Sequence, residues 1–509
     1  MSQRGSARDP ALNDPLAFER GTTQNLKRRS VRGAATTAAG QATKFAIRFG
    51  TIAVLARLIP PEHFGLVGMT VVFTGFVSMF ADAGLSSATI QREQITQRQI
   101  STLFWINVAI GFLLCAVAAG LAEPIARFYG EPRLRPICLA LALTFVLGGF
   151  GIQHQALLRR QMRFRALASV EVSSMLVGSA VGIILAWQDA GYWALVGMTL
   201  GATFANAGLV WLASSWRPSW SADVQEAKPL LRFGGDVLTF NVVNYFARQA
   251  DTLLVGWSWG PVALALYDKA YTLLLMPIKQ VNGPLSAVAV PALSRSQGEH
   301  AQFARYFLGI VEMVASLCLP LVLGIALFAD EIVRIWLGPR WAECADLFRL
   351  LAVAAAIGAI NNPLGWLLIS TGRTQRFRQL GVVNSSLIVL AFVLGLPHGA
   401  RGVALAYSIA TGVLMLPTWW FATHGTPVQL LNVARRIAPP LLACLPAAGV
   451  ALLVQRMNFG HASVWLTPLL AGLSFAATYV IMLLFVLRQW RFFREIVAQF
   501  RRAPVTPTQ

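Results

Sequence analysis

Apolar runs separated by charge clusters, Pro and Gly recur from residue 36 almost to the end of the chain. A run of about 20 apolar residues is long enough to cross roughly 30 Å of hydrocarbon as a helix. The pattern predicts an all-α polytopic membrane protein with about fourteen transmembrane helices. Their expected ranges are 36–58, 66–90, 101–122, 136–157, 166–187, 192–213, 231–257, 262–291, 306–328, 345–370, 379–396, 402–422, 437–454 and 463–487.

The composition supports lipid as the main solvent. Of the 509 residues, 56% are hydrophobic and 13% are charged, whereas about 25% of the residues of a soluble protein are charged. The five cysteines lie singly, mostly within apolar runs and without a CxxC pair, so we expect small apolar fillers and no metal ion, cofactor or disulfide. Residues 1–35 are polar and basic, which predicts a disordered cytoplasmic tail.

The net charge of +20 is unevenly distributed. If the N-terminal tail is cytoplasmic, the tails and loops on its side hold about 28 Lys and Arg, and the loops on the other side hold about eight. This asymmetry is typical of the cytoplasmic side of a membrane protein. We therefore expect both termini in the cytoplasm and no nucleic-acid partner.

The chain resembles itself at a shift of about 200 residues. The matching segments are Leu121–Arg127 with Phe328–Arg334, Pro132-Arg133 with Pro339-Arg340, and the basic turns Arg163–Arg165 with Arg376–Arg378. Because six helices per copy is an even number, the copies would be parallel, with the substrate path between them. Shared apolar composition is the alternative explanation. The expected organisation is a six-helix lobe at 36–213, a cytoplasmic connector at 214–230, a second lobe at 231–422, two further helices at 423–487 and a basic cytoplasmic tail at 488–509.

Polar residues within the predicted spans are costly in lipid and usually face a cavity. Lys44 and Arg48 are spaced i, i+4 on one face of the first span, and a stripe at steps of three or four follows the seventh span. That stripe consists of Asn241, Asn244, Arg248 and Asp251. Stripes on corresponding helices predict a hydrated cleft between the lobes. The alternatives are an Arg248–Asp251 ion pair between helices and a Lys44 side chain that reaches back to the cytoplasmic surface.

A cleft rich in Arg, Lys and Asn suits an anionic headgroup such as a diphosphate, because the planar guanidinium binds phosphate oxygens in pairs. Amide side chains would hydrogen-bond an attached sugar. The candidate substrate-binding residues are Lys44, Arg48, Asn107, Asn241, Asn244, Arg248, Lys269, Asn282 and Asn361. The candidate coupling residues are Asp82, Asp251 and Asp268.

Several segments also resemble a known family. They include Leu55-Ala-Arg-Leu-Ile-Pro-Pro-Glu-His-Phe-Gly-Leu66, Phe80-Ala-Asp-Ala-Gly-Leu-Ser-Ser87, Ser101-Thr-Leu-Phe-Trp-Ile-Asn107, Leu231-Arg-Phe-Gly-Gly235, Asn244-Tyr-Phe-Ala-Arg248 and Leu266-Tyr-Asp-Lys-Ala-Tyr271. These segments are similar to those of the polysaccharide transporter family, the Wzx-type flippases of the MOP superfamily, and look closest to its colanic-acid-type branch. The resemblance covers about residues 35 to 425.

The resemblance implies a flippase of the bacterial cytoplasmic membrane. Its cargo would be an undecaprenyl-diphosphate-linked oligosaccharide, moved from the inner to the outer leaflet by alternating access of the two lobes, for capsule, exopolysaccharide or O-antigen. The implied partners are the lipid bilayer, the polysaccharide polymerase and the chain-length machinery, around a monomeric transport unit. In related peptidoglycan-precursor flippases an extra helix pair forms a groove for the lipid, a role that segment 423–487 would share.

Two alternatives remain open. A multidrug antiporter of the same superfamily would prefer an acidic cleft for its cationic drugs, whereas here the cations at membrane depth equal or exceed the acids. A membrane glycan polymerase or ligase would need catalytic groups in a sizeable outer loop, and the expected outer loops are short, about 5 to 17 residues. No HExxH, GxSxG or P-loop motif occurs, which favours a protein that is not an enzyme.

Overall fold

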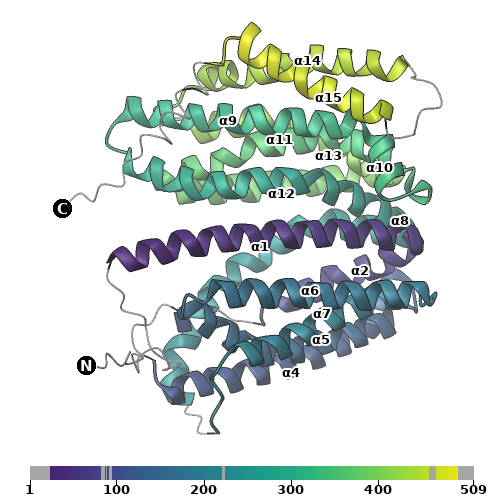
Figure 1. The fold of residues 1–509 in the computed structure, drawn as a ribbon, viewed down its shortest axis with the longest axis vertical. Coiled ribbons are helices and arrows are strands. Elements are labelled where there is room, and N and C mark those ends of the chain that lie inside the picture. Colours follow the sequence, from purple (N-terminus) through teal and green to yellow (C-terminus); the bar gives the residue numbers. More distant parts are fainter. Residues whose placement is uncertain are drawn as a thin grey trace, which may run out of the picture. The chain divides into compact units, whose positions relative to one another are not determined.

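The computed structural model describes residues 23–81, 86, 89–90, 95–220, 224–457, 466–490 and 494, and side chains from residue 39 except at 221–244, 246–248 and 287. All regular elements in these residues are helical (Figure 1). The long helices are α1 (Thr23–Leu58), α2 (Pro61–Ser78), α4 (Gln97–Tyr129), α5 (Leu134–Arg160), α6 (Phe164–Trp187), α7 (Trp193–Ala213), α8 (Val224–Arg295), α9 (His300–Leu327), α11 (Cys344–Ser370), α12 (Thr374–Gly395), α13 (Gly399–Thr423), α14 (Leu430–Arg456) and α15 (Leu466–Ile481). Shorter pieces are α10 (Ala329–Trp336), η2 (Pro339–Trp341), η3 (Leu396–His398) and the π-helical η4 (Met482–Val486).

These helices confirm the predicted all-α membrane fold. Ten segments of the described chain are long and apolar enough to cross a membrane, and one of them, Thr374–Thr423, contains both α12 and α13. Helix α8 contains the seventh and eighth predicted spans, which meet at Gly260, where φ is 76° and the helical conformation is interrupted. With α8 counted as two helices and α10 left out, the described helices correspond one to one to the predicted spans.

Two boundaries differ from the prediction. Helix α2 begins at Pro61, because Pro60 is extended and Pro61 supplies the fixed φ that suits a first helical position, and it ends at Ser78 rather than at residue 90. Helix α1 begins at Thr23, within the segment assigned to the disordered tail. The basic residues that suggested a tail, such as Lys27 and Arg28, are also good helix formers. Residues 1–22 lie outside the described part of the chain.

The chain divides into two compact units, Met1–Ala265 (unit 1) and Leu266–Gln509 (unit 2), each of which is described here by itself. The division falls within α8, five residues after Gly260, because the first part of α8 packs against α2. A Cβ at Gly65 would overlap the carbonyl oxygen of Pro261, and the Tyr245 hydroxyl donates to the carbonyl oxygen of Val72 at 2.8 Å. The expected lobe boundary at 214–230 stays a prediction.

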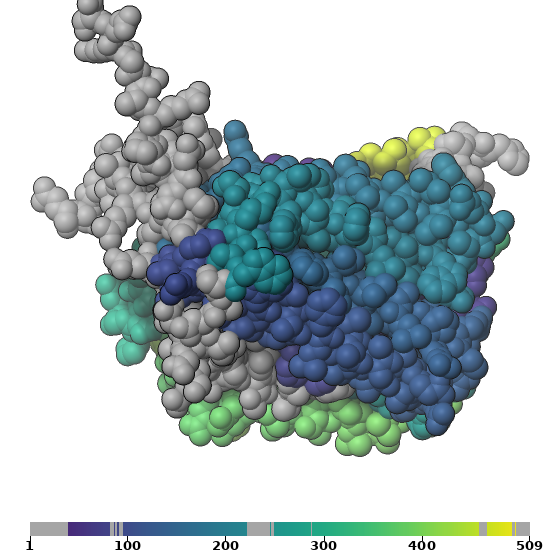
Figure 2. All heavy atoms as spheres, turned by 90° about the horizontal axis from the view of Figure 1, so that it is seen from below, coloured from purple at the N-terminus to yellow at the C-terminus, as the bar shows by residue number. Residues whose placement is uncertain are grey.

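In unit 1, α4 packs along α5 and α6 along α7, while α1 lies against α6 and α2 against α5. Figure 2 shows the continuous face that α4 to α7 form, coloured blue to teal. Glycines allow the α4 and α5 backbones to approach closely. A Cβ at Gly111 would lie 2.7 Å from the carbonyl oxygen of Phe145, and one at Gly149 would lie 2.8 Å from that of Asn107.

In unit 2, α9, α11 and α13 surround an apolar core, and α12 covers α13. The helices α14 and α15 pack against each other and against α9, as Figure 1 shows. Their buried side chains, among them Cys444, Ala447 and Phe475, belong to the same core cluster as Phe307 and Val311 of α9. The last two helices are therefore part of the core of unit 2.

One kind of tertiary contact occurs at the basic turns that match in the sequence, once in each unit, and the internal duplication stays a prediction. In unit 1 the Arg163 guanidinium donates to the carbonyl oxygen of Ala213, at the end of α7, at 3.0 Å. In unit 2 Arg376 donates to the carbonyl oxygen of His424, at the end of α13, at 2.5 Å. A basic turn thus caps the sixth helix of each copy, where unpaired carbonyls attract cations.

Candidate functional site

The seam between α1 and α6 holds the first of the predicted substrate-binding residues. Lys44 Nζ lies 2.5 Å from Glu171 Oε2, and the two side chains are 19% and 38% exposed. Two turns further on, the Thr51 hydroxyl donates to the Ser179 hydroxyl at 2.8 Å in a buried position. The charge of Lys44 is therefore neutralised within unit 1 by an acid that the sequence analysis did not single out.

Arg48 lies one turn beyond Lys44 on α1 and is exposed. It forms no ion pair with a residue that the structure describes, so no described carboxylate neutralises this cation within a predicted span. Arginine keeps its proton in any protein environment. Arg48 is therefore the described candidate best suited to attract an anionic group.

The polar stripe on α8 is described only in part. The backbone is helical through residues 241, 244, 248 and 251, so the predicted spacing on one face is retained. The side chains of Asn241, Asn244 and Arg248 lie outside the described residues. Asp251 is buried, and its Oδ1 accepts hydrogen bonds from the amide of Thr252 at 2.8 Å and from the Thr252 hydroxyl at 3.4 Å.

In unit 2, Lys269 Nζ lies 3.1 Å from Asp268 Oδ2, so these neighbouring candidates neutralise each other. Asn282 is half-buried, and both atoms of its amide group lack a hydrogen bond to any described residue. An unpaired buried amide is costly, which makes Asn282 a candidate to bind a ligand or water. The remaining coupling candidate, Asp82, lies outside the described residues.

The two asparagines predicted to bind sugar have different surroundings. Asn107 is fully buried on α4, and neither atom of its amide group has a hydrogen-bond partner among the described residues. Asn361 on α11 accepts a hydrogen bond from the indole N–H of Trp419 on α13, at 2.8 Å. Its oxygen therefore has a structural role that spacing along the sequence could not show.

Polar groups buried in α5 were not predicted from the sequence. Gln153 donates to the Thr89 hydroxyl at 2.8 Å, and Arg160 donates to the Thr89 carbonyl oxygen at 2.9 Å, which fixes Thr89 against α5. The His154 ring lies 4.5 Å from the Trp211 ring and 5.1 Å from the Trp216 ring, between centroids. The available signal was the presence of Gln, His and Arg in and just after an apolar span.

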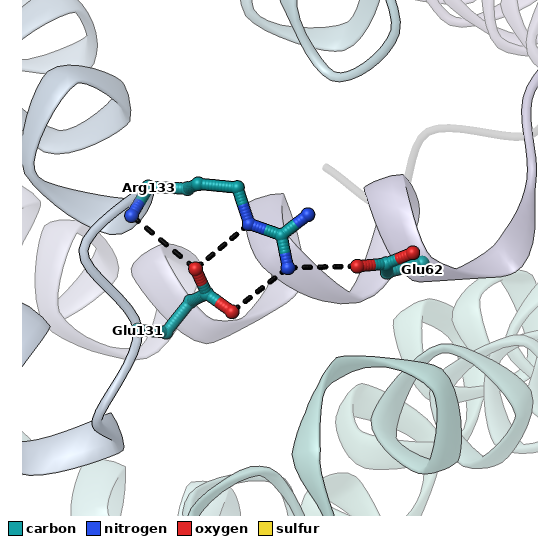
Figure 3. Close-up of polar contacts among 3 residues, drawn as sticks. All are labelled: Glu62, Glu131 and Arg133. Atoms are coloured by element: carbon teal, nitrogen blue, oxygen red, sulfur yellow. Dashed lines mark hydrogen bonds and ion pairs between the residues drawn. The ribbon is translucent and has the colours of Figure 1, made fainter.

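An ion-pair network joins the start of α2 to the α4–α5 turn, outside the spans (Figure 3). The Arg133 guanidinium donates to both oxygens of Glu131, at 2.7 and 2.8 Å, and to Glu62 at 2.7 Å. The hydrogen bonds from Arg133 hold the pKa of the Glu131 carboxyl below its usual value. Those carboxylates in turn raise the pKa of Arg133.

The described part of the chain contains no group of three or more His, Cys, Asp and Glu side chains that could hold a metal ion. Its polar side chains within the predicted spans include cations, acids, amides and hydroxyls. Such groups can bind and release a polar solute.

Comparison with known proteins identifies the family. Residues 54–346 match the family model described as "Polysaccharide biosynthesis protein". The chain is 25% identical over 390 residues to the lipopolysaccharide biosynthesis protein WzxC of Escherichia coli (strain K12), covering 75% of this chain and 78% of that protein. It is 27% identical over 353 residues to the teichuronic acid biosynthesis protein TuaB of Bacillus subtilis (strain 168), covering 69% and 70%.

Solved structures show the same fold. The lipid II flippase MurJ, in an inward closed conformation, matches with a TM-score of 0.69 and 14% identity, over 92% of this chain and all of that one. An inward-facing MATE-family multidrug resistance transporter of the MOP superfamily matches with a TM-score of 0.59 and 13% identity, over 77% and 95%. Because the family model covers more than half of the chain, the chain belongs to this family of polysaccharide biosynthesis proteins.

Proposed function

We propose that this protein is a flippase that moves an undecaprenyl-diphosphate-linked oligosaccharide from the inner to the outer leaflet of the bacterial cytoplasmic membrane by alternating access. The product would be capsule, exopolysaccharide or O-antigen. Support comes from relatives named for lipopolysaccharide and teichuronic acid biosynthesis and from a fold shared with a lipid II flippase. The role is transport, and no enzymatic step is assigned to the chain.

The observation that carries the proposal is the cation on α1 that no described acid neutralises. A diphosphate requires fixed positive donors, and an Arg side chain at membrane depth is retained at a cost that a bound anion offsets. Arg48 meets this requirement in the described structure. Lys44 would join it only after exchanging Glu171 for phosphate, because the two side chains are paired.

The other predicted binding residues are also part of the proposal. Arg248, Asn241, Asn244, Lys269 and Asn282 would contact the diphosphate and the first sugar, with Asn107 and Asn361 further along the path. Both termini would be cytoplasmic, with the two lobes at 36–213 and 231–422. The helices α14 and α15 would border the path of the lipid tail.

Substitution of Arg48 tests this proposal in the producing bacterium. With Arg48→Gln in place of the wild type, we expect at least about a tenfold fall in surface polysaccharide, from the loss of a charge-assisted contact to phosphate, and accumulation of the lipid-linked oligosaccharide. Arg48→Lys should retain part of the export. Arg127→Gln, at the far end of α4, is the control and should export normally.

Export that is unchanged in Arg48→Gln at equal protein level would contradict the assignment of Arg48. Altered susceptibility to cationic drugs, with normal polysaccharide, would favour the multidrug antiporter instead.

A further inference from the structure

The seam along which α14 and α15 pack against α9 lies in an apolar core but contains charged and polar side chains. The seam includes Val311, Ala315, Cys444 and Ala447, all buried. Within it lie Glu312 and, one turn later on the same face of α9, Ser316. Charge in such a position is costly in a membrane protein and usually has a function.

Only one of the two carboxylate oxygens of Glu312 has a partner among the described residues. Its side chain is 1% exposed, and its Oε2 lies 2.6 Å from Nη1 of Arg436 on α14. Its other oxygen, Oε1, has no hydrogen bond to a described residue. An ionised carboxylate can accept about four hydrogen bonds. This carboxylate therefore depends on a single partner for its charge.

Ser316 extends the polar seam. Pro320 lacks an amide hydrogen, so the carbonyl oxygen of Ser316, four residues earlier, loses its donor within α9. The Tyr479 hydroxyl of α15 replaces that donor, at 2.8 Å. The Ser316 hydroxyl itself is buried without a described partner. A hydroxyl oxygen one turn from Glu312 could accept a hydrogen bond if Glu312 carried a proton.

Arg436 differs from Glu312 in its access to water. Its side chain is 43% exposed, six residues after the start of α14, and its neighbour Arg435 is exposed. Pro440 leaves the Arg436 carbonyl oxygen without its donor within the helix, which weakens the helix at this point. The Arg436 guanidinium can therefore leave Glu312, bind water or lipid headgroups and stay charged. The buried Glu312 carboxylate cannot reach water in the same way.

The other titratable groups around α9 do not replace Arg436. On the two helices that complete the seam, the buried titratable groups are Cys444 of α14 and Tyr479 of α15, while Arg435 and Arg456 of α14 are exposed. The charged residues of α11, Asp346 and Arg349, lie in its first two turns and contact each other. On α10, Asp330 pairs with Arg349, and Glu331 accepts a hydrogen bond from Gln455. In the described structure Arg436 is the charged group in contact with Glu312.

We propose that Glu312 is a proton-binding site whose occupancy controls the attachment of α14 and α15 to α9. A hydronium ion gives a proton to the carboxylate, so that an O–H bond forms on Glu312 while an O–H bond of the hydronium ion breaks and water is released. The ion pair with Arg436 then breaks, and Arg436 keeps its own proton. A proton suits this site better than a metal ion, because the described residues contain no cluster of acidic or His ligands. The inference rests on the proposed flippase function only in naming the proton as its coupling ion.

The direct test is pH-difference infrared spectroscopy on the full-length protein in lipid nanodiscs. We expect acidification of the wild type to produce, besides the bands of exposed carboxyl groups, the band of a protonated carboxyl group in an apolar environment, and Glu312→Gln to remove that additional band. Glu331→Gln is the matched control, since Glu331 contacts the other end of α14, and it should retain the band. Equal spectra for the wild type and Glu312→Gln would overturn the proton site.

A second measurement tests the link to helix movement. Spin labels at Leu317 of α9 and Leu445 of α14, both exposed, in a background with the five cysteines replaced by alanine, report the distance between the helices. We expect a second distance population at acidic pH in the wild type and at all pH values in Glu312→Gln. Distances that do not respond to pH or to this substitution would overturn the control of attachment.

If Glu312→Gln does not fold, Glu312→Asp should shift the infrared band without removing it, and an unshifted band would contradict the assignment. These readouts need no substrate, so they stand if the proposed flippase function fails. Conversely, polysaccharide export that ceases in Arg48→Gln while the Glu312 band is absent would support the flippase and reject the proton site.

Discussion

An ion pair joins two helices in each unit, Lys44–Glu171 in unit 1 and Glu312–Arg436 in unit 2, and the two pairs are built in opposite ways. In unit 1 the cation is the more buried partner, since Lys44 is 19% and Glu171 is 38% exposed. In unit 2 the acid is buried, since Glu312 is 1% and Arg436 is 43% exposed. Breaking the first pair leaves a cation suited to an anionic ligand. Breaking the second leaves a carboxylate that a proton can neutralise.

The largest effect is expected from Arg436→Ala, which leaves Glu312 buried without its partner. Loss of one member of a buried ion pair costs about 3–5 kcal/mol. We expect a clear fall in the thermal unfolding temperature of the purified protein and in its yield. The double variant Glu312→Gln with Arg436→Gln should recover most of that loss. A stability equal to the wild type in the single variant would contradict the dependence of Glu312 on Arg436.

A smaller loss of stability is expected from Glu171→Gln, because the Lys44–Glu171 ion pair is partly exposed. We expect a loss of roughly 1 kcal/mol or less in stability. Lys44 would then be free of its acid, so the affinity of the purified protein for pyrophosphate, measured by calorimetry, should rise. Ser179→Ala, on the same seam, is the control and should leave that affinity unchanged. An unchanged affinity in Glu171→Gln would show that Lys44 does not reach an anionic ligand.

The smallest change in stability is expected in the ion-pair network of Arg133 with Glu131 and Glu62, outside the predicted spans. Because hydrogen bonds from Arg133 hold the pKa of Glu131 below its ordinary value of 4.5 in the folded protein, this group contributes stability above that pH. The contribution is lost as the pH falls through the folded pKa. In Arg133→Gln the acid-dependent part of thermal unfolding between about pH 5 and pH 3 should shrink, by about 1 kcal/mol or less. An identical pH profile in the variant would contradict this linkage.

The sequence predicted the spans and their breaks well, because lipid imposes a length and an apolar composition on each helix. The break at Gly260 followed from adjacent Gly and Pro. The start of α2 at Pro61 was missed, because the expected span began at residue 66. The end of α2 at Ser78 was missed, because Phe80 and Ala81 continue the apolar pattern after the helix has ended. The basic turns that led to the predicted repeat bind carbonyl oxygens at the ends of α7 and α13.

The site was less predictable. Glu171 and Glu312 are single acids in apolar spans, and the search for stripes at helical spacing passed over both. Their partners lie 127 and 124 residues away in the sequence, so no local pattern reports the pairing. The same holds for Asn361, whose partner Trp419 is on another helix. Which polar residue meets which is decided by helix packing, and spacing along one helix does not contain that information.

The central claim, that this chain carries a lipid-linked oligosaccharide across a membrane, is tested most directly with purified protein in liposomes. Lipid-linked oligosaccharide is placed in the inner leaflet only, and its arrival outside is followed by capture with an added lectin. The account predicts that the wild type makes the oligosaccharide accessible at a rate well above that of protein-free liposomes, and that Arg48→Gln does not. Equal rates for the wild type and protein-free liposomes would contradict it.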